Sequence, residues 1–281
     1  MRLPVAIVVG YRSQEVIGEC INALLAVPAL RVFVWDNSPD DATRSVIEAI
    51  GNDRIVVLSD GHNHGFGGGV NRAVAAALAD LNGPATLIVV NPDCVVTPQV
   101  VERLHTRVSG DDAGMVAPRM LYPDGRNGFA GGPWPSLLKE VAAATRLDDL
   151  LPVNLRNRII VAGGRALGRR NSLADTLREG PELEVDWVSG FCFAIRSELF
   201  ESVGGFDEDF FLYYEDVDLA RRVSAQGYRN LVLRDIEALH YESTSTRGVG
   251  KSKVYWRGFA TYCAKHKSKG AAWIAGLLAA S

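Results

Sequence analysis

Short runs of β-branched residues alternate with segments of helical pattern through about the first 120 residues of this chain. The predicted strands are Val5–Val9, Val32–Trp35, Ile55–Leu58 and Leu87–Val90, and the predicted helices are Glu15–Ala26, Asp41–Ile50 and Gly69–Leu81. Such alternation is typical of βαβ units and a mostly parallel sheet. Because the strands are continuously apolar, we expect helices on both faces of a Rossmann-like α/β fold.

Polar or glycine-rich segments follow all four predicted strands. They are Gly10-Tyr11-Arg12-Ser13, Asp36-Asn37-Ser38, HNHGFGGGVN at residues 62–71, and Asn91-Pro92-Asp93. In open parallel sheets, ligands bind outside the carboxyl ends of the strands. Each segment taken singly is also a common turn signal. Their succession favours one shared pocket.

The residues of these segments suit a nucleotide. Asp36 can accept a hydrogen bond from a pyrimidine ring N–H, and Tyr11 offers a face for the base. The alternatives are an Asx-turn aspartate and a rim tyrosine. Gly65 and Gly67 to Gly69 let the backbone approach a ligand, and the helix after them aims its N-terminal amides at a diphosphate. The stretch is not a P-loop, because the GK[ST] ending is missing.

A divalent cation is a further expectation at this edge of the sheet. Asp93 supplies one carboxylate there, and Mg²⁺ often uses only one or two protein carboxylates with substrate phosphates and waters. His240 is the candidate for a second ligand, since it follows the predicted strand Leu231–Leu233 and an irregular turn. The alternative for His240 is a satisfied or exposed side chain.

The run Gly204–Arg222, GGFDEDFFLYYEDVDLARR, groups six carboxylates around Phe and Tyr residues where a helix is expected to begin. Carboxylates beside rings suit a site that holds a sugar, deprotonates a hydroxyl group or faces a metal ion. The alternative is a helix N-terminus with acidic caps. We expect Asp218 to pair with Arg222 on the helix surface, contributing about 0.2–0.5 kcal/mol.

Composition excludes several classes of protein. A chain of 281 residues with 47% hydrophobic and 22% charged residues is ordinary globular protein. The net charge of −3 gives no general attraction to nucleic acid. The longest apolar stretch, Ala271–Ala280, is about half of what a membrane span needs. Four scattered cysteines without metal spacing, and a start without a signal peptide, predict a cytoplasmic protein.

Two segments suggest peripheral contact with the inner face of the plasma membrane. Residues 155–170, LRNRIIVAGGRALGRR, contain five arginines and no acid. Lys251–Ala280 adds lysines, aromatic residues and an apolar end. Both could meet anionic headgroups or the diphosphate of a lipid-linked acceptor. For residues 155–170 the alternative is a solvated loop.

Six motifs, in their order along the chain, resemble the family 2 inverting glycosyltransferases with a GT-A fold. They are IVVGYRS, VWDNS, HNHGFGGGVN, VNPD, WVSGFCFAIRSELFESVGGFDEDFFLYYEDVDLARR and ALHYEST, across residues 4–246. The nearest likeness is to the rhamnosyltransferases that build bacterial cell-surface polysaccharides. Galactofuranosyl and other sugar transferases of the family share much of the pattern.

The resemblance implies a role for each matching position. It makes Asp216, preceded by Glu215, the catalytic base, and it makes Asp93 and His240 the contacts of Mg²⁺ or Mn²⁺. It implies a nucleotide-sugar site formed by Tyr11, Asp36, Asn63, Gly65, Phe66, Asn71 and Asp93. It implies an acceptor site formed by Trp187, Ser189, Gly190, Asp207, Asp209 and Tyr214.

The chain departs from the family pattern at two positions. Asn91 leaves Asp93 as the only carboxylate of the DxD-type metal motif, and Gly10 stands where many members have a threonine. Asp207 and Asp209 have an alternative role as turn caps. Asp216 lies near a helix N-terminus, whose dipole is expected to keep its carboxylate ionised and only modestly basic.

The resemblance further implies four regions and a reaction. The regions are a nucleotide-sugar-binding half (1–120), a variable insertion (121–182), an acceptor-binding and catalytic half (183–246) and a C-terminal helical tail (247–281). The expected reaction moves L-rhamnose from dTDP-rhamnose, with inversion, to a hydroxyl group of a glycan or a polyprenyl-diphosphate-linked saccharide in cell-envelope polysaccharide synthesis. A homodimer is compatible with the sequence.

Other functions remain open at this point. One is a galactofuranosyl or other hexosyl transferase that uses a UDP-sugar, and another is a non-catalytic nucleotide-sugar-binding pseudoenzyme. A sugar-1-phosphate nucleotidyltransferase is disfavoured, because GYRSQEVIG lacks the long glycine-rich signature with Arg and Lys. A processive synthase is disfavoured, because the QxxRW motif and membrane spans are missing.

Overall fold

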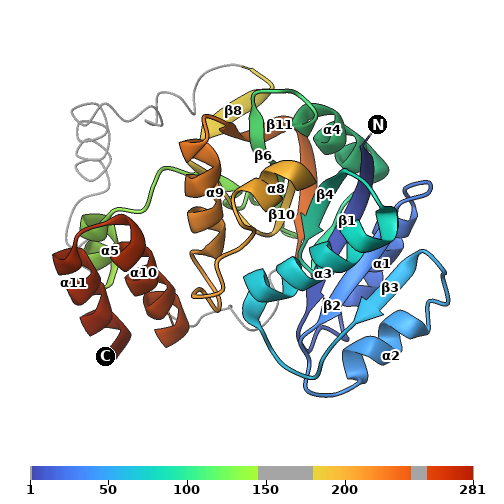
Figure 1. Cartoon of the computed structure of the whole chain (residues 1–281), viewed down its shortest axis with the longest axis horizontal. Coiled ribbons are helices and arrows are strands. Elements are labelled where there is room, and N and C mark those ends of the chain that lie inside the picture. The colour runs from blue at the N-terminus through green and yellow to red at the C-terminus, as the bar shows by residue number, and fades with distance from the viewer. Residues whose placement is uncertain (1, 145–179, 242–251, 281) are drawn as a thin grey trace.

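The structure, a computed structural model, describes residues 2–144, 180–241 and 252–280. Its centre is a nine-stranded sheet with helices packed on both faces (Figure 1). The strands of this sheet are β1 (Leu3–Gly10), β2 (Arg31–Asp36), β3 (Ile55–Leu58), β4 (Ala85–Val90), β5 (Cys94–Val95), β6 (Ala113–Leu121), β8 (Glu182–Val185), β10 (Cys192–Arg196) and β11 (Arg229–His240). A second, two-stranded sheet consists of β7 (Gly131–Gly132) and β9 (Trp187–Val188).

The main sheet has the strand order β3-β2-β1-β4-β10-β6-β11-β5, and β8 also pairs with β11. The pairs of β1 with β2 and β4, of β2 with β3, and of β6 with β11 are parallel. Strand β10 lies antiparallel between β4 and β6. The predicted α/β fold with a mostly parallel sheet is thus confirmed, and the four predicted strands lie within β1 to β4.

Nine helices surround this sheet in the described part of the chain. They are α1 (Ile17–Leu25), α2 (Ala42–Glu48), α3 (Gly65–Leu81), α4 (Pro98–Val108), α5 (Leu137–Ala144), α8 (Ser197–Ser202), α9 (Glu215–Ala225), α10 (Lys253–His266) and α11 (Lys269–Ala280). None of the described helices is long and apolar enough to cross a membrane. The arginine-rich run at residues 155–170 lies outside the described residues.

Helix α3 begins at Gly65, four residues before its predicted start, and its glycines face protein. A Cβ atom at Gly67 would lie 2.8 Å from Cβ of Phe206, and one at Gly69 would lie 2.8 Å from Cγ1 of Val9. Both distances are shorter than ordinary carbon–carbon contacts. These glycines therefore let α3 pack closely on the sheet and on the acidic run, and they do not open the backbone to a ligand as we expected.

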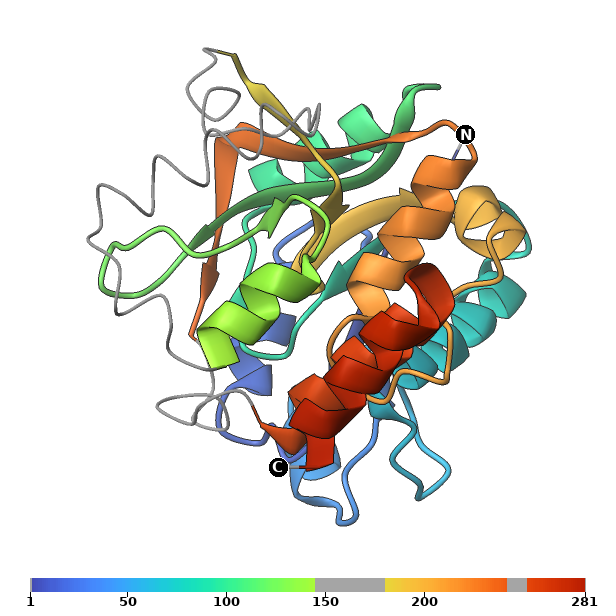
Figure 2. The same ribbon diagram turned by 90° about the vertical axis from the view of Figure 1, so that its left-hand side faces the viewer.

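The C-terminal helices form a second apolar cluster with the acidic run. Helices α10 and α11 lie side by side, and α10 packs beside α9 (Figure 2). Rings from both partners meet there, since Tyr214 lies 5.2 Å from Phe259 and 5.7 Å from Tyr262 between ring centroids. The tail predicted at residues 247–281 thus supports the start of α9.

Candidate active site

Three of the four polar segments meet at the carboxyl ends of β1 and β2. The backbone N–H of Asn37 donates to the carbonyl of Gly10 at 2.8 Å, and that of Arg12 donates to Oγ of Ser38 at 2.8 Å. The side-chain amide of Asn37 donates to the carbonyl of Gly65 at 2.9 Å. Hydrogen bonds therefore hold these segments together as one unit, as a shared pocket requires.

Tyr11 and Asp36 differ in their exposure at this edge. The Tyr11 side chain is open, with 49% of its surface exposed, and the guanidinium of Arg12 lies 5.5 Å from the centre of its ring. Asp36 is buried, and its Oδ1 accepts a hydrogen bond from the backbone N–H of Ser38 at 2.9 Å. Asp36 therefore makes an Asx-type contact through Oδ1, and its contact with a base remains a proposal, while the exposed Tyr11 ring is available for stacking.

Asn71 and Asn63 bond to protein backbone in this structure. The amide of Asn71 donates to the carbonyl of Phe206 at 2.9 Å and accepts from its N–H at 2.8 Å. Oδ1 of Asn63 accepts from the N–H of Gly65 at 2.9 Å. Both polar groups of Asn71 hold the acidic run against α3, and its predicted contact with the nucleotide remains a proposal.

Gly65 and Phe66 likewise connect α3 to the acidic run. Gly65 has φ of +72°, and a Cβ atom there would overlap the carbonyl oxygen of Phe211. The Phe66 ring packs edge-on against Phe206, with centroids 5.8 Å apart. The absence of a side chain at Gly65 therefore makes room for the Phe211 carbonyl, and the predicted nucleotide role of Gly65 remains a proposal.

Asp93 and His240 lie together because β5 pairs with the end of β11. His240 is opposite Cys94 in this pair, and the N–H of Tyr241 donates to the carbonyl of Asp93 at 3.0 Å. Nε2 of His240 consequently lies 3.1 Å from Oδ1 of Asp93. The irregular turn predicted before His240 is corrected, since β11 continues to this residue with a shift of register after Leu233.

The Asp93–His240 pair fits a divalent cation that also binds a substrate. Both side chains are largely buried, and Nδ1 of His240 is buried without a hydrogen-bond partner among the described residues. No group of three or more His, Cys, Asp or Glu side chains in the described ranges could hold a metal ion without further ligands. A carboxylate and an imidazole suit Mn²⁺ or Mg²⁺ when phosphates and waters complete the shell.

Asp216 lies at the same edge of the sheet. Its Oδ2 accepts from the N–H of Gly190 at 2.9 Å, and its Oδ1 accepts from the N–H of Val217 at 2.8 Å. The next residue after Gly190 is Phe191, whose carbonyl accepts from the N–H of Asn91 at 2.8 Å. The segment before β10 therefore connects Asp216 to the turn that carries Asp93. Gly190 serves through its backbone, and its predicted contact with an acceptor remains a proposal.

The backbone just before Asp216 is strained. Tyr213 and Tyr214 have φ of +69° and +72°, a region that residues with a side chain rarely adopt. Such strain tends to collect at functional sites, where surrounding structure enforces it. Here α10 enforces it, because a Cβ atom at Gly258 would overlap the carbonyl oxygen of Tyr213. The first turn of α9, with Glu215 and Asp216, is thus held in place by its packing against α10.

Burial raises the pKa values of both Glu215 and Asp216. The Glu215 pKa is raised first by loss of solvation and then by the charge of Asp216. The Asp216 pKa is raised by loss of solvation, against the lowering effect of the Gly190 and Val217 amides. The expectation of a weakly basic Asp216 at a helix dipole is therefore corrected. Its raised pKa brings it closer to that of an effective general base.

These shifts predict that pH changes the stability of the fold. Because the folded-state pKa of Glu215 is raised, the folded chain holds this proton more tightly than the unfolded chain. The fold then loses stability as the pH rises from about 4.3, the pKa of a glutamate in an unfolded chain, through the raised pKa of Glu215 in the folded chain. We expect Glu215→Gln to increase the free energy of unfolding above neutral pH, on the order of 1–3 kcal/mol.

Urea unfolding of wild type and Glu215→Gln across a pH series measures this difference directly. The gain should shrink towards zero below about pH 3.5, where Glu215 is mostly protonated in both states. A gain that is the same at every pH would instead indicate a packing effect of the substitution.

Several predicted acceptor residues have partners inside the protein. The Tyr214 hydroxyl is buried and donates to the Tyr255 hydroxyl at 2.7 Å. Asp207 and Asp209 both accept from Nζ of Lys265 at 2.7 Å. The three side chains therefore join the acidic run to α10, and their role towards an acceptor remains a proposal.

Trp187 lies in β9, and Ser189 follows this strand and precedes Gly190. Nε1 of Trp187 donates to the carbonyl of Pro133 at 3.0 Å, and the backbone N–H of Ser189 donates to the carbonyl of Ala130 at 2.9 Å. Trp187 is half-buried, with its ring 5.5 Å from that of Phe129. Both residues therefore lie next to Gly190, whose N–H donates to Asp216, and their role towards an acceptor stays a proposal.

Asp218 is not on the helix surface, contrary to prediction. Its side chain is buried, Oδ2 accepts from Nε of Arg222 at 2.8 Å, and Oδ1 lies 2.6 Å from Nε2 of His266. His266 lies 48 residues further along the chain, so no local spacing indicates this contact. The pairing with Arg222 is confirmed, but it belongs to the core.

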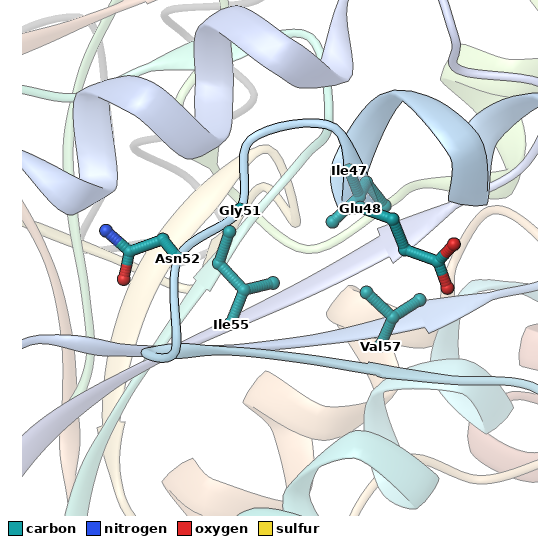
Figure 3. Close-up of a pocket in the computed structure, with 6 residues that line it drawn as sticks. All are labelled: Ile47, Glu48, Gly51, Asn52, Ile55 and Val57. Carbon is teal, nitrogen blue, oxygen red and sulfur yellow. The ribbon is translucent and has the colours of Figure 1, made fainter.

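A separate hollow lies at the opposite end of the sheet. Its lining comes from α2, the loop after it and β3: Ile47, Glu48, Gly51, Asn52, Ile55 and Val57 (Figure 3). Ile55 is the first residue of β3, so this hollow faces the amino ends of the strands. It is shallow and mostly apolar, and none of the predicted site residues lines it.

Residues 4–258 match the family described as glycosyltransferase like family 2. N-acetylglucosaminyl-diphospho-decaprenol L-rhamnosyltransferase of Mycobacterium tuberculosis is 33% identical over 224 residues, which cover 76% of this chain and 67% of that protein. A hexosyltransferase of low-salt glycan biosynthesis from Haloferax volcanii is 25% identical over 250 residues, which cover 89% and 71%.

A solved structure agrees with these relatives in fold. It is the mannosyltransferase PcManGT from Pyrobaculum calidifontis in complex with GDP-Man and Mn²⁺. The TM-score is 0.58 at 16% sequence identity, and the alignment covers 99% of this chain and 68% of that one. The fold implied by the six motifs is thereby confirmed.

Proposed function

Because the chain belongs to the family 2 glycosyltransferases, we propose that it moves L-rhamnose from dTDP-rhamnose, with inversion, to a hydroxyl group of a lipid-linked saccharide. The observation that carries this proposal is the Gly190–Phe191 segment, which bonds Asp216 on one side and the Asp93 turn on the other. A base and a candidate diphosphate site thus stand at one edge of the sheet. The rhamnose assignment rests on the 33% identical relative, whose name states both sugar and lipid carrier.

The proposed reaction is a single displacement. The acceptor oxygen forms a bond to the anomeric carbon while the bond from that carbon to the diphosphate oxygen breaks, through an oxocarbenium-like state. Asp216 accepts the hydroxyl proton, and the nucleoside diphosphate leaves with the bonding electron pair. The Gly190 and Val217 amides orient the Asp216 carboxylate, and the higher pKa of Glu215 leaves Asp216 the more readily ionised of the two.

Asp93 and His240 are the residues that would hold Mg²⁺ or Mn²⁺. Such a cation supplies positive charge that stabilises the leaving diphosphate. The Pyrobaculum relative was solved with Mn²⁺ and GDP-Man together, which supports a shared cation and diphosphate site in this fold. Tyr11 and Asp36, at the ends of β1 and β2, are proposed to bind the base.

Asp93→Ala is expected to weaken donor binding in the presence of Mn²⁺ by about 10- to 100-fold, because a charged contact to the cation is lost. Calorimetric titration of the nucleotide sugar, with Mn²⁺ and with excess chelator, measures the effect. Asp40→Ala is the control, since Asp40 is an exposed aspartate of the loop after β2. Full binding and activity of the wild type in excess chelator would remove Asp93 from this role.

The donor can be identified by thermal stabilisation with a panel of nucleotide sugars. A ligand at a hundred times its dissociation constant stabilises the fold by about 2.7 kcal/mol, so a true donor is easily separated from the rest. Stabilisation by dTDP-rhamnose supports the proposal, and preference for a UDP-sugar supports the galactofuranosyl or hexosyl alternative. Donor binding without any transfer in the wild type would indicate the non-catalytic alternative.

A further inference from the structure

Helix α11 presents large apolar side chains to solvent. Trp273 is 68% exposed, Leu277 is 52% exposed and Ile274 is 36% exposed. Lys269, Trp273 and Leu277 are spaced four residues apart and so form one row, with Ile274 beside it. We call these four residues the α11 face. The opposite side of α11, with Ala271 and Ala275, is buried against the rest of the C-terminal cluster.

The surroundings of the α11 face are positively charged. Residues 247–281 contain seven Lys and Arg residues and no Asp or Glu, although the whole chain has a net charge of −3. Lys269 belongs to the face itself, and Lys267 lies two residues before it; both are exposed. Lys265 of α10 is bonded to Asp207 and Asp209.

We propose that the α11 face docks on a lipid bilayer that contains anionic phospholipids. Tryptophan suits the boundary between headgroups and acyl chains, isoleucine and leucine suit the apolar side of it, and lysines suit lipid phosphates. A helix of 12 residues is about 18 Å long, against about 30 Å of hydrocarbon, so α11 lies along the surface and does not cross it.

Charge favours the bilayer over a second copy of this chain. In a two-fold dimer the same patch contributes from both sides, so the lysines of one α11 face would approach those of the other. Such like charges oppose association. An anionic bilayer attracts the lysines and also offers an apolar phase for the three large side chains.

Docking through α11 would orient the active site. Helix α10 packs against α11 and bonds to the region of Asp216. The Tyr255 hydroxyl accepts from the Tyr214 hydroxyl at 2.7 Å, and the Tyr262 hydroxyl accepts from the Arg221 guanidinium at 3.3 Å. Helix α5 lies beside α11 (Figure 2). The helix that carries Asp216 therefore has a fixed relation to the proposed bilayer surface. This inference stands on the α11 face and does not depend on which sugar is transferred.

Sedimentation of the full chain with lipid vesicles tests the inference. We expect binding to vesicles of phosphatidylcholine with phosphatidylglycerol, and much weaker binding to phosphatidylcholine alone. Leu277→Ala and Trp273→Ala should each reduce binding about tenfold, because a buried apolar side chain is lost from the interface. Lys269→Glu should reduce it severalfold, and more at low salt than at high salt.

Matched variants make the result specific. Leu3→Ala removes a leucine of similar exposure, 56%, at the start of β1, and it should leave binding unchanged. Arg44→Glu reverses a charge on α2 and should also leave binding unchanged. Equal binding to neutral vesicles, or full binding by Leu277→Ala and Trp273→Ala, would overturn the inference. A dimer that forms in solution and is lost in Trp273→Ala would assign the face to a second copy.

Discussion

Asp216→Asn is expected to lower the rate of sugar transfer by about 10²–10⁴-fold, the range in which a positioned general base contributes. Asparagine keeps the shape of the side chain and an oxygen that can accept from the Gly190 or Val217 amide. It cannot take up the proton of the acceptor hydroxyl. Binding of the nucleotide sugar should stay near normal, because the residues proposed to contact the nucleobase and the diphosphate lie on other segments.

Initial rates of transfer and calorimetric donor binding together test this role. Glu208→Gln is the matched control from the same acidic run, since Glu208 is exposed and bonded to Arg72. It should keep most of the activity. Loss of donor binding in Asp216→Asn would exclude Asp216 as the base, whereas unchanged transfer in this variant would assign proton removal to another group.

Asp218→Ala is expected to have the largest effect on stability, about 3–5 kcal/mol of unfolding free energy. The Asp218 side chain is buried between Arg222 and His266, so its removal leaves the cation of Arg222 without its carboxylate. Arg222 also donates to the carbonyls of Val203 and Gly205, which lie at the start of the acidic run. The variant should therefore loosen both ends of this run.

Urea unfolding of Asp218→Ala and of Glu48→Ala separates a buried pair from an exposed one. Glu48 lies 3.7 Å from Arg44 at the same i, i+4 spacing, with its side chain 60% exposed. Such an exposed pair contributes about 0.3–0.5 kcal/mol. If both variants lose a similarly small amount of stability, Asp218 makes no special contribution to the core.

Residues with local signals were predicted best. The four strands were recognised because buried parallel strands leave continuous apolar runs, and the order of the motifs was enough to predict the fold. Asp93 and His240 were proposed as partners, and they do lie together. Their contact depends on the pairing of β5 with β11, which the sequence does not show.

Contacts between distant segments were missed. Asn71, Gly65 and Tyr214 were interpreted as ligand-binding residues because they stand in motifs, and their contacts with Phe206, Phe211 and Tyr255 were not predicted. The signal that could have indicated this is the group of aromatic residues in both the acidic run and α10. Rings in two separate segments are consistent with mutual packing as well as with sugar binding.

The sequence by itself determined the kind of fold and the residue types at the site, because apolar periodicity and motif order are properties of the linear chain. Only the tertiary structure decided the state of each acidic side chain. Glu215 is buried and Asp216 is half-buried, and loss of solvation raises the pKa values of both. Asp218 is buried between Arg222 of α9 and His266 of α10. The solvation and the ion pairing of each carboxylate depend on residues that lie 26 to 48 positions away in the sequence. Carboxylates within four positions of one another therefore have different roles.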